Sequence, residues 1–271
     1  MTTPPGFEPV GMSNVDAAAD PTAMVSYLDQ MAAAVGDRRR ATYQLLDLRE
    51  GQRFLDVGCG AGEVLIDVAR LVGPAGRVSG VDLAETMVET TRARLRAAGI
   101  DGDVRRADAH HLPFDDASFD RARIERVLQH VEDPVTVLAE IRRVLVPGGM
   151  VLAVDPNHEQ ADVATADVET WRVLRRHTVE RVRHPRAGLH LREWLVAAGL
   201  VDVRLEPSAF ATPWPLFRTM TLLDKGAENA IAARELTREQ FERWLQEQDA
   251  RHGAGTFAGI LAGYRCLGTK L

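Results

Sequence analysis

The feature that most constrains this chain is a regular alternation of short apolar runs and helical segments through its middle. Runs at RFLDVG, RVSGVD, DVRRAD, FDRARI and MVLAVD have the length of buried strands, and helical spacing follows most of them, as at Glu63 to Leu71 and Ala84 to Ala98. Strands that alternate with helices form right-handed βαβ units. The alternation therefore predicts an α/β, doubly wound, Rossmann-like fold with a mostly parallel sheet.

One helix within this region has well-marked boundaries. Asp133 can cap its first turn, Pro134 suits its first position, and Pro147 with two following glycines predicts its end.

With 271 residues the chain is long for one domain and short for two, so we expect one α/β core with helical additions. Residues 1–50 are expected to form an N-terminal arm and two lid helices, the first around Met24 to Met31. Residues 51–271 are expected to form the main domain, with lid insertions at about 156–195 and 208–252.

Outside this middle region the chain gives weaker signals, which nevertheless predict individual elements. The expected elements are helices at Arg38 to Leu48, Val168 to Arg183 and Leu191 to Ala198, a strand at Val201 to Leu205, an apolar loop in PSAFATPWPLF, a capping box at Thr237 with Gln240, and a last strand in FAGILAGYRCLG.

Composition excludes several classes of protein. A net charge of −6 argues against a nucleic-acid binder, because phosphate affinity needs uncompensated Lys and Arg. Cys59 and Cys266 show neither disulfide nor metal-ligand spacing, so no metal is expected. Without a leader pattern or an apolar run long enough for a bilayer, we expect a cytoplasmic protein that binds neither nucleic acid nor membrane.

The turn LDVGCGAGE indicates a nucleotide-like ligand. Its glycines, Gly58, Gly60 and Gly62, have the spacing GxGxG, and Glu63 stands where a dinucleotide fingerprint has its third glycine. Asp56 and Glu63 flank the place where a pyrophosphate would bind, so the turn suits a ligand with a cationic end.

Two further strand ends carry acids. Asp82 ends the second strand, where an acidic residue accepts the hydroxyls of a ribose, and Asp108 follows the third. The glycine turn and these acids, in order and at βαβ spacing, predict a ligand that contains adenosine but no phosphate.

The segments DVGCGAGE, GVDLAETM, ADAHHLPFDDASFD and RVLVPGGMVLAVDP resemble successive motifs of the class I methyltransferases that use S-adenosylmethionine, especially the small-molecule branch of quinone and natural-product enzymes. The resemblance covers about Gln52 to Asp155. It implies a seven-stranded sheet with an antiparallel last strand, and S-adenosylmethionine as the cofactor.

The resemblance also implies roles for individual residues. Asp56, Gly58, Cys59 and Gly60 would surround the methionine portion of the cofactor, and Asp82 would bind its ribose. The other implied cofactor contacts are Leu83 and Met87 near the ribose and adenine, Asp108 and the Ala109 amide at the adenine edge, and Ile124 with Glu125 near the methionine amine.

A hydroxyl acceptor also needs a base, and the candidates follow the ends of the fourth and fifth strands. They are Glu125, His130, Asp155 and His158. Some relatives use a His after the fourth strand, but here the usual His-His pair reads Gln129-His130. The base therefore stays open, and each candidate could instead be a capping, packing or solvated residue.

We predict methyl transfer to a small hydrophobic or polycyclic hydroxylated metabolite, with oxygen favoured over carbon or nitrogen as the methylated atom. The arginines of WRVLRRHTVERVRHPR could receive an acidic acceptor, although a solvated helix face is the simpler interpretation. Two alternatives remain: a cofactor-binding protein that catalyses a non-methylating cyclisation or rearrangement, and a nicotinamide oxidoreductase. The sequence leaves open whether the protein is a monomer or a homodimer.

Overall fold

The computed structural model describes Asp16, Val25, Asp29 and residues 36–271 except 181. The expected helix around Met24, Tyr27, Leu28 and Met31 lies outside the described residues. The second expected helix is present over residues 36–43 and continues as a 3-10 turn, η2 (Gln44–Leu46).

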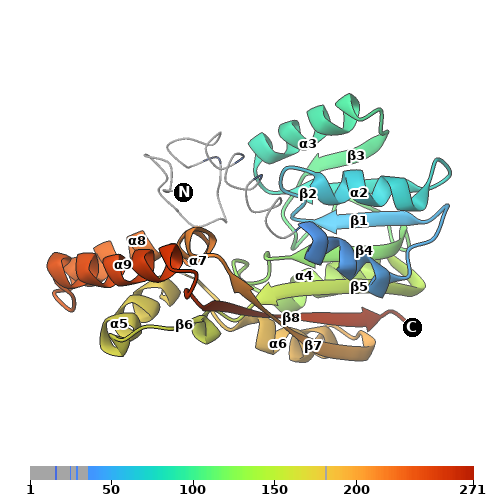
Figure 1. The fold of residues 1–271 in the computed structure, drawn as a ribbon. Helices are drawn as coiled ribbons and strands as arrows, with labels where there is room; N and C mark the ends of the chain where they lie inside the picture. The colour runs from blue at the N-terminus through green and yellow to red at the C-terminus, as the bar shows by residue number, and fades with distance from the viewer. Residues whose placement is uncertain (1–15, 17–24, 26–28, 30–35, 181) are drawn as a thin grey trace.

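Within the described residues, a sheet of eight strands forms the centre of the molecule (Figure 1). The strand order is β3-β2-β1-β4-β5-β8-β6, and β7 pairs with β8 outside this path. The strands are β1 (Arg53–Val57), β2 (Arg77–Asp82), β3 (Gly102–Arg106), β4 (Phe119–Glu125), β5 (Leu145–Pro156), β6 (Asp162–Val163), β7 (Val201–Thr212) and β8 (Gly259–Thr269).

The first five strands run parallel, and β8 is antiparallel to β5. The predicted Rossmann-like class and the antiparallel last strand are therefore confirmed. Seven strands were expected, and the eighth is the two-residue β6, which pairs with the start of β8 at Asp162 and Val163.

Successive strand residues point to opposite sides of the sheet, so apolar strands present side chains on both faces. Helices cover both of these faces. Phe54 of β1 packs in a core with α2 (Glu63–Val72) and α3 (Glu85–Ala97). Its neighbour Leu55 packs in the opposite core, with α4 (Pro134–Val144) and α6 (Ala187–Ala197). The parallel half of the sheet is thus buried on both faces, as its continuous apolar runs predict.

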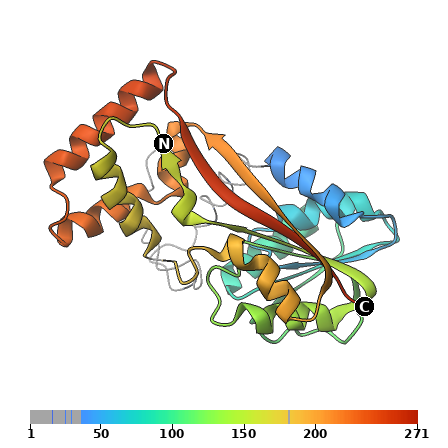
Figure 2. The same cartoon turned by 90° about the horizontal axis from the view of Figure 1, so that it is seen from below.

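A helical lobe lies at one end of the sheet and is joined to it by the long β7–β8 pair (Figures 1 and 2). Its helices are α5 (Val168–Val179), α7 (Trp214–Met220), α8 (Leu223–Ala232) and α9 (Arg238–Gly253). They share a third core, built around the stacked rings of Trp171 and Trp244 and the ring of Phe217.

The predicted boundary signals are partly confirmed. Asp133 accepts hydrogen bonds from the Val135 and Thr136 amides at the start of α4, and Thr237 forms a complete capping box with Gln240 at α9. The predicted end of α4 at Pro147 is wrong: the helix ends at Val144, and β5 begins immediately with Leu145.

The expected apolar loop in PSAFATPWPLF is also wrong, because this segment completes β7 and then forms α7. Pro207 fits in β7 because the described pairing of that strand is with β8 alone, which makes it an edge strand. Pro213 stands before α7 and Pro215 in its first turn, where a missing N–H costs nothing. Pro213 and Pro215 therefore mark the boundary between β7 and α7, and Pro207 lies within the edge strand.

Candidate functional site

The glycine turn joins β1 to α2 and requires its glycines for backbone reasons. Gly58, Gly60 and Gly62 have φ angles of 74°, 53° and 90°, in the left-handed region that side chains disfavour. A Cβ on Gly58 would also lie 2.2 Å from Cγ2 of Val127, which follows β4. The turn therefore packs against the end of β4 with no room for a side chain.

Asp82 ends β2 beside this turn. Its carboxylate accepts hydrogen bonds from the Gly60 amide at 2.9 Å and the Ala84 amide at 3.0 Å, and burial raises its pKa. Each carboxylate oxygen keeps a second lone pair, so the group can still accept ribose hydroxyls. The neighbouring Leu83 is 50% exposed, which leaves an apolar surface next to the acid.

Asp56 lies inside the protein with a partner that the sequence analysis missed. Asp56 and Arg123 are neighbours across β1 and β4; both are 2% exposed, and their Oδ1 and Nη1 atoms are 3.6 Å apart. Arg123 also pairs with Glu125 at the end of β4. Burial nevertheless raises the pKa of Asp56 to about 7, while the nearby arginines oppose that rise.

Glu63 is paired as well, which corrects the electrostatic argument made from the sequence. Its Oε1 lies 2.6 Å from Nη1 of Arg94 on α3, and Arg94 also binds Asp29 at 2.8 Å. Asp56 and Glu63 therefore flank the turn as expected, but neither presents an uncompensated negative charge. The glycine geometry and Asp82 are therefore stronger evidence for an adenosine-containing ligand than the charges of Asp56 and Glu63.

Asp108 and Ala109 lie in the turn after β3, as expected. The Asp108 side chain is 56% exposed, and its Oδ1 accepts hydrogen bonds from the His110 amide and ring, at 2.9 and 2.6 Å. These contacts to His110 help to hold the pKa of Asp108 below its usual value, against the opposing effect of burial. Its second oxygen can accept from a ligand.

Three expected cofactor contacts have side chains that point into the protein. Ile124 belongs to the core under the sheet, Met87 is 1% exposed, and the Cys59 side chain lies close to Gly80 of β2. Burial also raises the pKa of Cys59 far above its usual value. Successive side chains of a strand point to opposite faces, so Ile124 points into the core while its neighbour Glu125 points to the other side. In this structure, contacts from Ile124 and Cys59 to a ligand would have to be made by their main chains.

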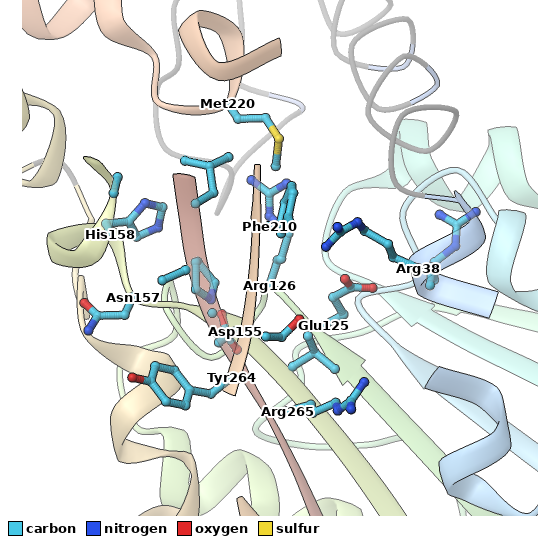
Figure 3. Close-up of a pocket in the computed structure, with 18 of the residues that line it drawn as sticks. Arg38, Glu125, Arg126, Asp155, Asn157, His158, Phe210, Met220, Tyr264 and Arg265 are labelled. Carbon is cyan, nitrogen blue, oxygen red and sulfur yellow. The ribbon is translucent and has the colours of Figure 1, made fainter. Parts of the chain in front are cut away.

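A cavity of about 280 Å³ opens beyond the ends of β4 and β5 (Figure 3). Figure 3 shows Asp155 and Tyr264 at one end, Met220 at the other, and Arg126 with Phe210 between them. Glu125 also lines this cavity and pairs with Arg123, which contacts Asp56 beside the glycine turn. The cavity therefore adjoins the glycine turn through a continuous chain of charged groups.

His158 lines the cavity on the short 3-10 turn η3 (His158–Gln160) after β5. Its Nε2 lies 2.6 Å from Oε1 of the buried Gln129, and the Gln129 amide nitrogen donates to the Arg126 carbonyl at 3.2 Å. Since an amide oxygen only accepts, the His158 proton resides on Nε2 and leaves Nδ1 as a lone-pair acceptor. Burial lowers the pKa of His158 to about 4, so the ring is neutral at pH 7.

Asp155 reaches the same cavity from the end of β5. It is 1% exposed, and neither carboxylate oxygen reaches hydrogen-bonding geometry with the described residues, although the Gln129 and Leu128 amides lie close by. Burial raises its pKa to about 8, although the Gln129 and Leu128 amides and the Arg126 charge oppose the rise. A buried carboxyl without a partner is costly, which makes Asp155 a candidate to bind a ligand directly.

His130 does not line the cavity, although the sequence made it a candidate base. Its Nε2 is buried without a partner among the described residues, and burial together with the Arg126 charge lowers its pKa to about 4. The arginine run on α5 also lies apart from the cavity: Arg172 pairs with Glu169, and Arg176 with Glu235. Arg172 and Arg176 are 62% and 53% exposed, so this part of the run is a solvated face, as the simpler interpretation held.

The cavity residues that sequence reasoning missed are Arg38 and Arg126, and it did not identify Gln129 as a partner of His158. The missing first histidine of the His-His pair was a signal for Gln129. Among the described residues, no helix is long and apolar enough to cross a membrane, and no group of potential metal ligands gathers in one place.

A family model described as a methyltransferase domain matches residues 55–154. These residues include the glycine turn, Asp82, Asp108, and β4 with most of β5.

Two curated proteins illustrate the relationship. An uncharacterized 37.1 kDa protein in a transposon of Streptomyces fradiae is 37% identical over 227 residues, which are 82% of this chain and 65% of that protein. A demethylmenaquinone methyltransferase of Bacillus cytotoxicus is 36% identical over 118 residues, which are 43% of this chain and 50% of that protein. The chain thus matches less than two thirds of the length of either relative.

Among solved structures, the YcgJ protein of Bacillus subtilis superposes with a TM-score of 0.58 at 21% identity, over 84% of this chain and 95% of that one. At this identity the likeness supports the fold.

Proposed function

The chain carries a methyltransferase domain of the class I, S-adenosylmethionine-dependent family, and from this premise we propose that the whole protein methylates a small hydrophobic, hydroxylated molecule. We favour oxygen as the methylated atom. The observation that carries the proposal is the cavity after β4 and β5, because it adjoins the glycine turn and contains a neutral histidine with an orientated lone pair.

The residues around the glycine turn fit the cofactor. Beside the glycine turn, Asp82 offers oxygens to a ribose, and the exposed Leu83 offers an apolar surface to an adenine. Arg39, whose Nε is buried without a partner among the described residues, lies close enough to Asp56 to oppose the rise in its pKa. We assign Arg39 to the cofactor's carboxylate and Asp56 to its ammonium group.

When bound, S-adenosylmethionine would supply a methyl group activated by its sulfonium, with S-adenosylhomocysteine as the leaving group. The protein's task is to align the acceptor oxygen with that methyl group in a cavity shielded from water. His158 Nδ1 takes the proton of the acceptor hydroxyl as the oxygen–carbon bond forms. Gln129 keeps the ring in the required tautomer.

Asp155 supports this arrangement from the other side. With a pKa of about 8 it is mostly protonated at pH 7, so it can donate a hydrogen bond to a second oxygen of the acceptor. We also propose that the helical lobe serves as the acceptor lid, since Thr178 of α5 and Met220 of α7 line the cavity.

The cofactor assignment is tested by calorimetric titration. We expect S-adenosylmethionine and S-adenosylhomocysteine to bind, and NADH not to bind. Binding of NADH with neither of the other two would replace this proposal by a nicotinamide oxidoreductase.

The chemistry is tested by incubating hydroxylated acceptors with methyl-labelled S-adenosylmethionine. Transfer of label is expected, and His158→Ala should lower the rate about 10²–10⁴-fold, the usual contribution of a general base. His190→Ala is the matched control, because His190 lies exposed on α6 and stacks on Trp194 away from the cavity. A product formed without label would favour a cyclisation or rearrangement instead.

A further inference from the structure

Among the charged residues that line the acceptor cavity, arginines outnumber acids, and only some of these groups have an ion-pair partner. Four of them are arginines, Arg38, Arg39, Arg126 and Arg265, and only Glu125 and Asp155 are acids. Two of these groups are already paired: Arg265 with Glu206 at 2.8 Å, and Glu125 with Arg123.

Arg38 and Arg126 form no ion pair with any carboxylate of the described residues. The buried Nε of Arg126 also has no hydrogen-bond acceptor there. Asp155 does not balance these charges, because it is mostly protonated at pH 7. With Arg39 assigned to the cofactor, two cations still face the acceptor without a counter-charge.

Arg126 is held in the cavity by an unusual backbone. It follows β4 directly, its amide donates to the Val154 carbonyl at 2.8 Å, and its φ angle is 59°. A left-handed conformation strains a residue with a side chain, and such strain gathers where function requires a fixed direction. The backbone thus aims Arg126 beyond the strand end, where its charge acts on Asp155, His158 and His130.

Arg38 approaches from the helix over residues 36–43. Its guanidinium carbon lies 4.3 Å from the centre of the Phe210 ring, so the ring face positions the charge and leaves its N–H edges available. Figure 3 shows Phe210 beside Arg126 within the cavity. Phe210, Met220 and Leu261 make much of the remaining wall apolar.

We propose that the acceptor is an aromatic hydroxy acid whose carboxylate pairs with Arg126, assisted by Arg38 at the cavity mouth, while its ring packs on Phe210. Cavities for drug-sized ligands measure about 300–1,000 Å³. A cavity of about 280 Å³ therefore fits an acceptor of one or two rings. This inference rests on the proposed methyltransferase function and specifies its substrate class.

The test compares acids with their neutral amides. The probes are 4-hydroxybenzoate, 4-hydroxyphenylacetate and 6-hydroxy-2-naphthoate, each beside its own primary amide, titrated into the full chain saturated with S-adenosylhomocysteine. At least one acid should bind, and at least tenfold more tightly than its amide. Arg126→Gln should remove this preference, Arg126→Lys should keep part of it, and Arg38→Gln should reduce it about threefold.

The matched control is Arg265→Gln, which removes a cavity arginine that already has a carboxylate partner and should leave the acid preference within twofold of the wild type. S-adenosylhomocysteine affinity and thermal unfolding show whether each variant is folded. If a variant does not fold, the acid–amide comparison in the wild type still tests the proposal.

The inference is overturned if no acid binds, if amides bind as tightly as acids, or if the preference survives Arg126→Gln. Failure of S-adenosylhomocysteine to bind would overturn the proposed function itself. Binding of S-adenosylhomocysteine without any acid preference would overturn the substrate class alone.

Discussion

The two halves of the proposed site are built in different ways. Most groups of the cofactor half lie within a few residues of the ends of β1, β2 and β3: the glycine turn, Asp82 and Asp108. Arg39 joins them from the helix over residues 36–43. The acceptor half gathers Arg38, Arg126, His158 and Phe210 from four distant parts of the chain.

The two halves of the proposed site depend on different properties of their residues. The cofactor half depends on backbone conformation, which local sequence fixes through glycine and strand–turn–helix spacing. The acceptor half depends on side chains that meet only after the β7–β8 pair and the helical lobe have formed. Substitutions should therefore act through backbone geometry in the first half, and through charge and burial in the second.

The largest effect is expected in the cofactor half, for Gly58→Ala. The new Cβ would lie 2.2 Å from Val127, and the residue would keep a φ angle of 74°. Left-handed strain of about 1–2 kcal/mol and overpacking of about 1–3 kcal/mol should add. Urea unfolding measures the loss of stability, and calorimetry with S-adenosylhomocysteine should show at least a hundredfold loss of affinity.

Gly148→Ala is the matched control for this comparison. Gly148 has nearly the same φ angle, 76°, but a Cβ there would meet nothing within 4 Å. It should show the strain without the overpacking, and no change in affinity. Equal losses of affinity in both variants would contradict the view that close packing at the turn shapes the cofactor half.

The contrast between groups set by local backbone and groups brought together by the fold also explains what could be predicted from the sequence. The α/β class and the caps at Asp133 and Thr237 follow from local patterns, whereas the antiparallel last strand was implied by the family resemblance; the structure has all of them. Arg123 was missed because only the β1–β4 register brings it beside Asp56. The arginine run on α5 is visible in the sequence but lies apart from the cavity, whereas Arg38 and Arg126 come to line the same cavity only in the fold.

A smaller effect is expected in the acceptor half, from the buried Asp155. Its pKa rises on folding from its usual value of 3.8 to about 8, so the unfolded chain loses this proton first as the pH increases. The folded state therefore loses stability between about pH 4 and pH 8, by about 1.4 kcal/mol for each pH unit. Between pH 5 and pH 7 the loss is on the order of 2–3 kcal/mol.

Asp155→Asn should abolish this component. Asp56 contributes a loss of the same sign and His158 a gain, so the quantity to measure is the difference between wild type and variant in urea unfolding at pH 5 and pH 7. The variant should gain on the order of 2–3 kcal/mol relative to the wild type over that interval. Parallel pH profiles would mean that Asp155 is ionised in the fold, and the acceptor half would then hold a full negative charge.

The smallest effect is expected in the helical lobe, for Thr237→Ala. Thr237 Oγ1 accepts from the Gln240 amide at 3.1 Å, and its own amide donates to Gln240 Oε1 at 2.8 Å, at the start of α9. Loss of the cap should cost about 1 kcal/mol in urea unfolding, and Thr237→Ser, which keeps the hydroxyl, should cost less. Since the lobe lines the acceptor cavity and the glycine turn lies in the other half, S-adenosylhomocysteine affinity should stay within twofold. A large loss of that affinity would show that the two halves are energetically coupled, and that the lobe helps to hold the cofactor as well as the acceptor.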